Sequence, residues 1–222
     1  MNKFLSVLKA NKDAIIKPVV VLFAICIIIP LALSLTNKIT VDRIAALEEE
    51  NQKAAMSTLV SADNFQKKGL DLIDVAEPFE YYVAENSGVP VAYLFVTSSK
   101  GYGGDVSVMT AINPDGTVKS VAILDASNET PGLGQNVTKE NFYSQFAGKK
   151  FGISVMKNGA NIENNEINAV TGATISSRAV AKAVDKALDN YMAVAADTGI
   201  LKDSIAEVET IINDQEVAVN EE

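Results

Sequence analysis

The feature that most constrains this chain is a continuous apolar segment near its N-terminus. Residues 18–36 contain no Asp, Glu, Lys or Arg and consist mainly of Val, Ile, Leu, Phe and Ala. A helix of about 20 apolar residues is long enough to cross the hydrocarbon core of a bilayer. Pro18 suits the first turn of a helix, and Pro30 is tolerated inside a membrane span. We therefore expect one transmembrane helix over residues 18–36.

The charges on either side of this segment predict its orientation. Four lysines precede it within residues 1–17, against the single acid Asp13, whereas the charge after it is mixed and then acidic. Cytoplasmic flanks of membrane spans carry the excess of Lys and Arg. We expect a single-pass protein of the cell (inner) membrane, with residues 1–17 as a cytoplasmic basic leader and the chain beyond Asn37 extracytoplasmic.

Two alternatives for the apolar segment stay open. Ala32-Leu33-Ser34 resembles the small-residue cleavage site of a signal peptide, although the leader is long and the apolar run fills a full span. A buried core helix is the other alternative, but soluble cores seldom use such a long unbroken apolar run.

The composition excludes several kinds of chemistry. The chain has no His and no Trp, and Cys26 is its single cysteine. A Ser-His-Asp triad, His-ligated zinc and His-ligated haem are therefore excluded, and one thiolate cannot hold an iron–sulfur cluster. We predict no metal site and no catalytic residue, so redox chemistry would have to come from an organic cofactor. The net charge of −9 also argues against nucleic acid as a partner.

Helix-favouring and acidic segments flank the central part of the chain. Residues 37–75 start with a run rich in Ala, Leu, Glu and Lys, which predicts a juxtamembrane helical segment. The end of the chain, residues 201–222, is dominated by acidic residues and is predicted to be a solvated tail.

Residues 76–200 read as a single α+β domain. Between Phe79 and Ile123 the sequence is rich in β-branched and aromatic residues, and Asn113-Pro114-Asp115-Gly116 predicts a hairpin turn. Helical pattern follows at residues 139–146, then a short strand near residues 152–156, and then a long helix after Thr174. Strands followed by helices are typical of an α+β domain.

The start of that last helix carries a candidate ligand site. Thr171-Gly172-Ala173-Thr174 precedes apolar residues at helical spacing. A helix start presents unpaired N–H groups and a positive dipole end, and Gly172 allows a ligand close to the backbone. A phosphate could therefore bind here, within reach of the Thr174 hydroxyl. The alternative is a helix cap, because Thr and Ser are favoured there without any ligand.

Two further glycine-containing loops lie upstream. Gly101-Tyr102-Gly103-Gly104 stands between two predicted strands, which excludes a dinucleotide fingerprint and leaves either a β turn or a loop beside a ligand. Glu129-Thr130-Pro131-Gly132-Leu133-Gly134 follows a strand and precedes a helix. Loops in this position often bind ligands, although an ordinary connection is the alternative.

Taken together, the Glu-Thr-Pro-Gly-Leu-Gly and Thr-Gly-Ala-Thr sequences, about forty residues apart, resemble the FMN-binding domain family. This family includes the G subunit of the Rnf complex and the C subunit of the sodium-translocating NADH:quinone reductase. The Gly-Tyr-Gly-Gly loop, the Asn-Pro-Asp-Gly hairpin, residues 142–149 and the single N-terminal span resemble the G subunit.

The resemblance implies a flavoprotein electron carrier. Thr174 would carry FMN through a phosphoester that a separate flavin transferase forms from FAD. Glu129, Thr130 and Leu133 would lie along the flavin or its ribityl chain, and Thr171, Gly172 and Ala173 would shape the phosphate end. The chain would be a relay in a membrane ferredoxin:NAD+ oxidoreductase complex that exports Na+ or H+, with the other redox subunits as its partners.

The sequence departs from the family pattern at three positions. Ser127 stands where family members often have His, which implies a different flavin potential or contact. Asn168 stands where many have Asp, which bears on recognition by the transferase, and Thr171 replaces a frequent Ser. The alternatives at this stage are a C-type subunit of the quinone-reducing relative, a non-redox exported binding module, and a structural anchor subunit.

Overall fold

The computed structural model describes residues 12–70 and 78–198 of the chain. It divides into two compact units, Met1–Glu50 and Asn51–Glu222, which are described separately. Residues 1–11 of the predicted basic leader and the whole predicted acidic tail, residues 201–222, lie outside the described residues.

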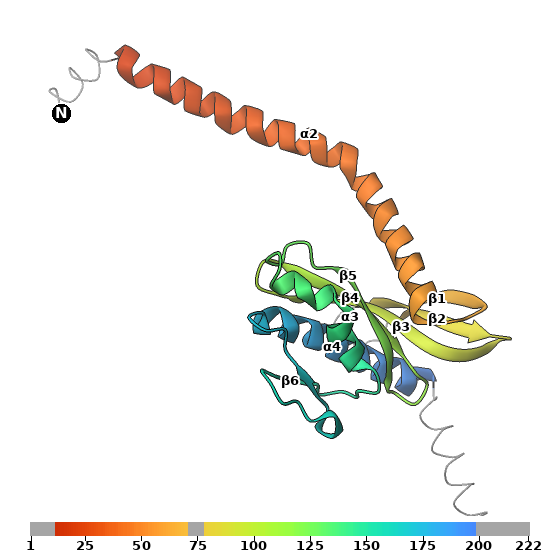
Figure 1. The fold of residues 1–222 in the computed structure, drawn as a ribbon. Coiled ribbons are helices and arrows are strands. Elements are labelled where there is room, and N and C mark those ends of the chain that lie inside the picture. Colours follow the sequence, from red (N-terminus) through yellow and green to blue (C-terminus); the bar gives the residue numbers. More distant parts are fainter. Residues whose placement is uncertain (1–11, 71–77, 199–222) are drawn as a thin grey trace, which may run out of the picture. The chain divides into compact units, whose positions relative to one another are not determined.

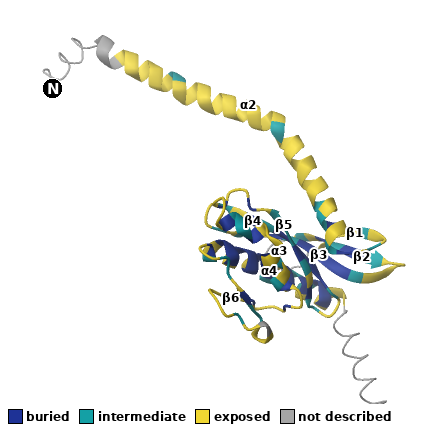
Figure 2. Ribbon diagram, viewed as in Figure 1, coloured by how far each residue is buried: buried dark blue, intermediate teal, exposed yellow. Residues whose placement is uncertain are grey.

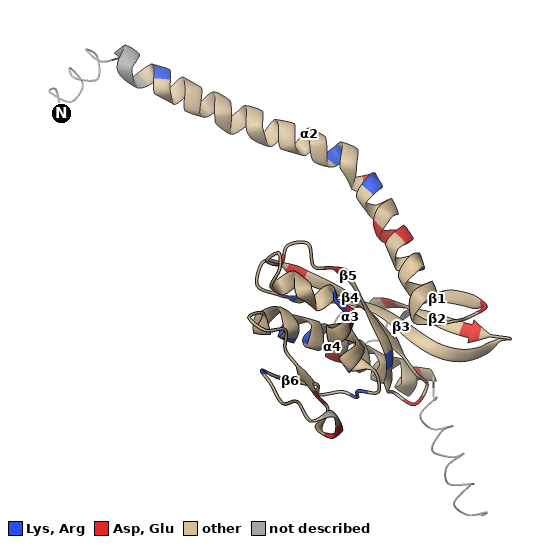
Figure 3. Ribbon diagram, viewed as in Figure 1, with Lys and Arg blue, Asp and Glu red and all other residues tan. Residues whose placement is uncertain are grey.

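The first unit holds most of one long helix, α2 (Lys12–Leu59), which contains both Pro18 and Pro30. Its most apolar 18-residue window has a mean hydropathy of 2.9, and none of that window is buried. Large apolar side chains are exposed along it, and no charged residue interrupts it between Lys17 and Lys38 (Figures 2 and 3). The predicted span lies entirely within α2, and by length and composition this helix can cross a membrane.

The second unit is built on a five-stranded antiparallel sheet, whose strands lie in chain order (Figure 1). The strands are β1 (Asn64–Leu70), β2 (Phe79–Asn86), β3 (Val89–Lys100), β4 (Asp105–Ile112) and β5 (Val118–Asp125). The predicted hairpin turn joins β4 to β5, where the Gly116 N–H donates to the Asn113 carbonyl at 2.9 Å. Gly116 has φ +81°, a conformation that glycine adopts without strain.

Helix α4 (Thr174–Thr198) covers one face of this sheet and forms the larger core with it. Its buried residues recur at three- and four-residue spacing, which is how a helix presents one apolar face. Polar contacts also hold it in place: the Thr97 hydroxyl donates to the Ala183 carbonyl at 2.7 Å, and the Tyr191 hydroxyl donates to the Pro114 carbonyl at 2.5 Å.

The last turns of α2, from Asn51 onward, pack on the other face of the sheet. Met56 and Val60 are buried there against small and apolar side chains of the central strands: Ala84, Ala92, Leu94, Met109 and Ala111. The Ser120 hydroxyl donates to the Leu59 carbonyl at 3.0 Å. The sheet of the second unit is therefore covered by helix on both faces, and the expected α+β class is confirmed.

Short elements lie between β5 and α4. They are η1 (Gly134–Thr138), α3 (Glu140–Tyr143), η2 (Ser144–Phe146), β6 (Ser154–Met156), η3 (Ile162–Asn164) and β7 (Glu166–Asn168). The helical segment expected over residues 139–146 and the strand expected near residues 152–156 are both present. β6 and β7 pair in parallel as a separate two-stranded sheet.

One predicted boundary differs from the structure. The helical segment was expected to continue over residues 37–75, but α2 ends at Leu59 and residues 64–70 form β1 instead. β1 is an edge strand whose residues are mostly exposed, and it is held by its register with β2, including a Lys67–Glu80 ion pair at 2.7 Å. Pairing with β2, which the local composition does not reveal, overrides the weak helix preference. The domain therefore includes residues before position 76.

Candidate functional site

The Thr-Gly-Ala-Thr sequence forms a tight turn into α4. Gly172 has φ +77°, the left-handed region that disfavours other residues. The Ala173 N–H donates to the Val170 carbonyl at 2.9 Å, and the Ser177 N–H makes the first helical hydrogen bond, to Ala173. Thr174 is therefore the first residue of the helix, as expected, and Ala173 occupies the capping position.

The donors at this helix start have no acceptor within the described residues. This holds for the backbone N–H groups of Thr174, Ile175 and Ser176, and the Thr174 hydroxyl also makes no hydrogen bond there. A capping Thr would accept a hydrogen bond from a backbone N–H two or three residues later. The capping alternative for Thr174 is therefore not supported, and its hydroxyl is available for chemistry.

The Glu129–Gly134 loop lies next to this helix start. Its Thr130 carbonyl accepts from the N–H groups of Leu133 and Gln135, at 3.1 and 3.2 Å, which folds the loop into η1. The Leu133 side chain lies against the helix turn, because a Cβ on Gly172 would be 3.2 Å from Leu133 Cδ2. Two segments about forty residues apart in the sequence are thus in contact.

Between them lies a cavity of about 550 Å³, within the usual range for small-molecule sites. Its lining residues are Tyr102, Thr130, Leu133, Gly134, Gly172, Ala173, Thr174, Ile175 and Ser176. Five of the seven predicted site residues are therefore brought together. Glu129 and Thr171 do not line this cavity.

The cavity has an apolar rim and no charged side chain in its lining. Tyr102, Leu133 and Ile175 are exposed by 73%, 46% and 53%, and large apolar side chains exposed together are typical of a binding site. Sequence reasoning did not select the other four lining residues, Tyr102, Gly134, Ile175 and Ser176. The signal for Tyr102 and Gly134 was their place within the two glycine-containing loops, and Ile175 and Ser176 follow Thr174 in the first turn of α4.

Glu129 is only 2% exposed and accepts hydrogen bonds from residues that line the cavity. Its Oε1 accepts from the N–H groups of Tyr102 and Gly103 at 2.8 and 3.1 Å, and its Oε2 accepts from the Ser176 hydroxyl at 2.5 Å. Burial alone would raise the pKa of this carboxyl. The hydrogen bonds from Ser176 and from the backbone of Gly103, Tyr102 and Gly104 outweigh burial and hold the pKa below its ordinary value. Glu129 is therefore a buried carboxylate.

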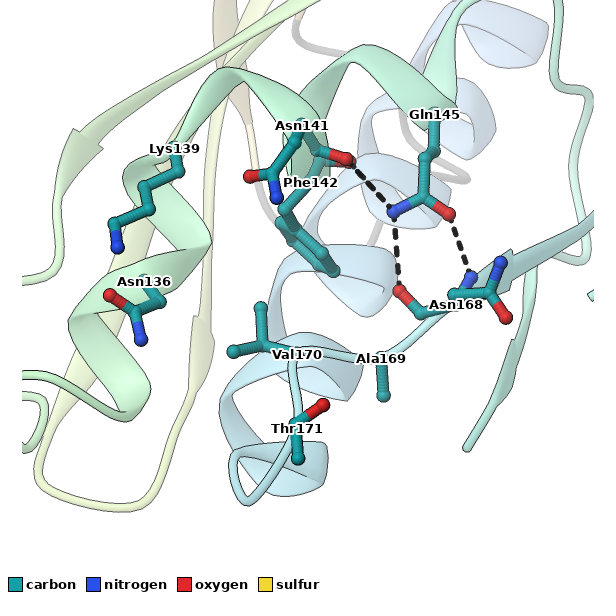
Figure 4. Close-up of a pocket in the computed structure, with 9 residues that line it drawn as sticks. All are labelled: Asn136, Lys139, Asn141, Phe142, Gln145, Asn168, Ala169, Val170 and Thr171. Atoms are coloured by element: carbon teal, nitrogen blue, oxygen red, sulfur yellow. Dashed lines mark hydrogen bonds between the residues drawn. The ribbon is translucent and has the colours of Figure 1, made fainter. Parts of the chain in front are cut away.

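A second, more polar cavity of about 450 Å³ is lined in part by the 168–171 segment (Figure 4). Thr171 and Asn168 line it, together with Asn136, Lys139, Asn141, Phe142, Gln145, Ala169 and Val170. The Gln145 side chain binds both backbone groups of Asn168. Its Oε1 accepts from the Asn168 N–H at 2.8 Å, and its Nε2 donates to the Asn168 carbonyl at 3.3 Å. This contact fixes the chain just before the Thr-Gly-Ala-Thr turn.

Comparison with known proteins shows the family to which the chain belongs. The FMN-binding domain matches residues 101–189, a range that contains every residue lining the first cavity. The G subunit of the proton-translocating ferredoxin:NAD(+) oxidoreductase complex of Clostridium ljungdahlii is 37% identical over 166 residues. The match covers 74% of this chain and 84% of that protein. The chain belongs to this family of G subunits and contains an FMN-binding domain.

Other members of the G-subunit family match over a similar extent. The G subunit of the Na(+)-translocating complex of Acetobacterium woodii is 34% identical over 185 residues, covering 77% of this chain and 88% of that protein. Among solved structures, the C subunit of the Na(+)-translocating NADH-quinone reductase of Parabacteroides distasonis matches at 22% identity. That match has a TM-score of 0.48 and covers 59% of this chain and 76% of that one.

Proposed function

We propose that this chain is an FMN-carrying electron-transfer subunit of a membrane ferredoxin:NAD+ oxidoreductase complex of the Rnf type. The observation that carries the proposal is the first cavity, where a free Thr174 hydroxyl and unpaired helix N–H groups face an apolar rim. It occurs in a chain of the G-subunit family.

The cavity residues fit FMN at both of its ends. The N–H groups of Ile175 and Ser176 at the start of α4 would bind the phosphate, since helix starts favour anions. Tyr102, Leu133 and Ile175 offer apolar surface for the flat ring. The bound flavin would supply transfer of one or two electrons, and this chain's residues would hold it and limit its contact with water.

The absence of a cation from the cavity lining favours a covalent attachment. None of the nine lining residues is Lys or Arg, so a phosphate dianion would find only backbone donors and the helix dipole there. Such contacts are weak next to bidentate Arg recognition. A phosphoester to the Thr174 hydroxyl would retain the cofactor without them. Threonine is a weak nucleophile and requires activation, which a separate flavin transferase using FAD would supply.

The remaining features concern the complex. α2 would anchor the subunit in the membrane with its N-terminus cytoplasmic and the FMN domain on the other side, since lysines dominate the leader. The other redox subunits would pass electrons to and from the flavin. The coupling ion would be Na+ or H+, because the names of the related proteins include both.

A single gel experiment tests the cofactor and its attachment. The full chain is co-expressed with a flavin transferase, separated under denaturing conditions and viewed under ultraviolet light. We expect a fluorescent band in the wild type and in Thr58→Ala, a control on an exposed turn of α2, and no fluorescence in Thr174→Ala. Fluorescence that persists in Thr174→Ala would contradict the attachment residue. A dark wild-type band would contradict the covalent attachment, because a denaturing gel retains only covalently bound flavin.

A further inference from the structure

Glu129 joins three segments of the chain at one buried point. It belongs to the Glu129–Gly134 loop, accepts two backbone hydrogen bonds from the 101–104 turn, and accepts the Ser176 hydroxyl from the first turn of α4. Each of these three segments also contributes residues to the lining of the first cavity. One carboxylate therefore connects three segments that line the site.

The neighbouring glycines fit around this carboxylate. A Cβ on Gly101 would collide with Glu129 Oε1, and a Cβ on Gly134 would collide with Oε2 and lie 2.8 Å from Ser176 Oγ. Neither glycine has a positive φ, so packing space is what requires glycine at these two positions. At both glycines the backbone lies so close to the carboxylate that no space is left for a Cβ.

The charge of Glu129 is satisfied by donors instead of a cation. The described residues provide N–H groups and one hydroxyl, and no ion pair with Glu129 is found among them. A buried carboxylate with this many donors is strongly held, and removing it would leave several donors unpaired. Both of its oxygens accept hydrogen bonds from these internal donors, and Glu129 is not among the residues that line the cavity.

We propose that Glu129 is a positioning residue of the flavin site, which holds Tyr102, Leu133 and the start of α4 at the spacing that a flavin requires, without touching the flavin itself. This inference rests on the proposed function and deepens it. The family resemblance implied that Glu129 contacts the flavin directly. We infer that it acts on the flavin only through the three segments that it holds in place.

The test compares three substitutions of Glu129 in the full chain, purified in detergent without flavin. The rate of covalent attachment is measured by fluorescence after FAD and a flavin transferase are added. Glu129→Ala removes the clamp and Glu129→Asp is one methylene too short to reach both sides, so we expect both to slow attachment about tenfold. Glu129→Gln can still accept from Tyr102 and Gly103 and can donate to Ser176, so it should rescue most of the rate.

A control variant and a second measurement keep the outcomes distinct. Glu140→Ala, an exposed acid on α3, should react like the wild type. Hydrogen exchange of the Tyr102 and Gly103 amides, measured without flavin, should be faster in Glu129→Ala than in Glu129→Gln. Attachment at the wild-type rate in Glu129→Ala would overturn the proposal, and so would a Gln variant as slow as Ala. If the wild type gains no covalent flavin, the proposed attachment at Thr174 fails, and the exchange data alone decide whether Glu129 holds the loops together.

Discussion

At the scale of single residues, the buried Glu129 and the half-buried Asp185 behave in opposite ways. Glu129 has enough donors to offset its burial, so its pKa is lowered. Asp185 on α4 accepts only the N–H groups of Gly152 and Ile153, both through Oδ1, at 2.9 and 3.1 Å. Burial outweighs these two bonds and raises the pKa of Asp185. The folded state therefore disfavours the charged form of Asp185.

This difference predicts a pH-dependent effect of Asp185→Asn. The amide oxygen can accept both N–H groups while the charge is removed. Because the folded-state pKa is raised, Asp185 binds protons more tightly when folded, and its contribution to stability is lost as pH rises through the acidic range. We expect Asp185→Asn to be more stable than the wild type at pH 7, with a gain that shrinks towards pH 3. Thermal unfolding at several pH values measures this, and a gain that grows on acidification would contradict it.

Gly172 provides a second prediction at this scale. With φ +77°, an Ala at this position would cost about 1 kcal/mol of stability through backbone strain, and its Cβ would press on Leu133. We expect Gly172→Ala to lower stability by that amount and to lower flavin attachment as well. Gly159 has φ +73° and open space around its Cβ position, so Gly159→Ala is a matched control. It should lose similar stability and keep attachment, as chemical denaturation and the gel assay can show.

At the scale of elements, the sequence predicted the features that depend on short local patterns. The apolar span, the Asn-Pro-Asp-Gly hairpin and the start of α4 at Thr174 were all predicted, because each depends on residues close together in the chain. β1 was missed because Asn64–Leu70 contains two lysines, a glycine and no alternating apolar residues. Its strand conformation comes from the register with β2, which is a tertiary effect.

The end of α2 predicts an asymmetry between two methionines. Met56 is 4% exposed and packs on the second face of the sheet, whereas Met192 on α4 is 41% exposed. Met56→Ala should destabilise the domain by about 2–4 kcal/mol through lost burial and a cavity, and Met192→Ala should change stability by less than about 1 kcal/mol. Chemical denaturation of both variants measures the difference. Equal losses would show that the α2 turns do not support the sheet.

At the scale of the whole molecule, the sequence predicted which loops form the site but not how they are held together. Thr130, Leu133 and the residues 172–174 meet at one cavity, as the motifs suggested. The buried position of Glu129 was not predictable, because it depends on donors from residues 102–103 and 176 that only the fold brings together. The sequence shows a charged residue in a loop, and burial of such a residue is the rare outcome.

The division of the chain into two units leads to a prediction about truncation. A chain that starts at Asn51 keeps both cores of the second unit, including Met56 and Val60. It should be soluble and monomeric without detergent. A chain that starts at Asn64 would expose the apolar face around Leu94 and Met109, and should aggregate. Size-exclusion chromatography of the two fragments without detergent distinguishes them, and equal solubility would contradict a role for the last turns of α2.

The packing around Glu129 also has an evolutionary consequence. Because its carboxylate occupies the space that a Cβ at Gly101 or Gly134 would need, the fitness effect of a change at any of the three positions depends on the other two. A larger residue fits at either glycine position only after a smaller residue has replaced Glu129. Across relatives, these positions should therefore change as a set or stay fixed together, and lineages that replace Glu129 are where alanine or serine should first appear at the two glycines.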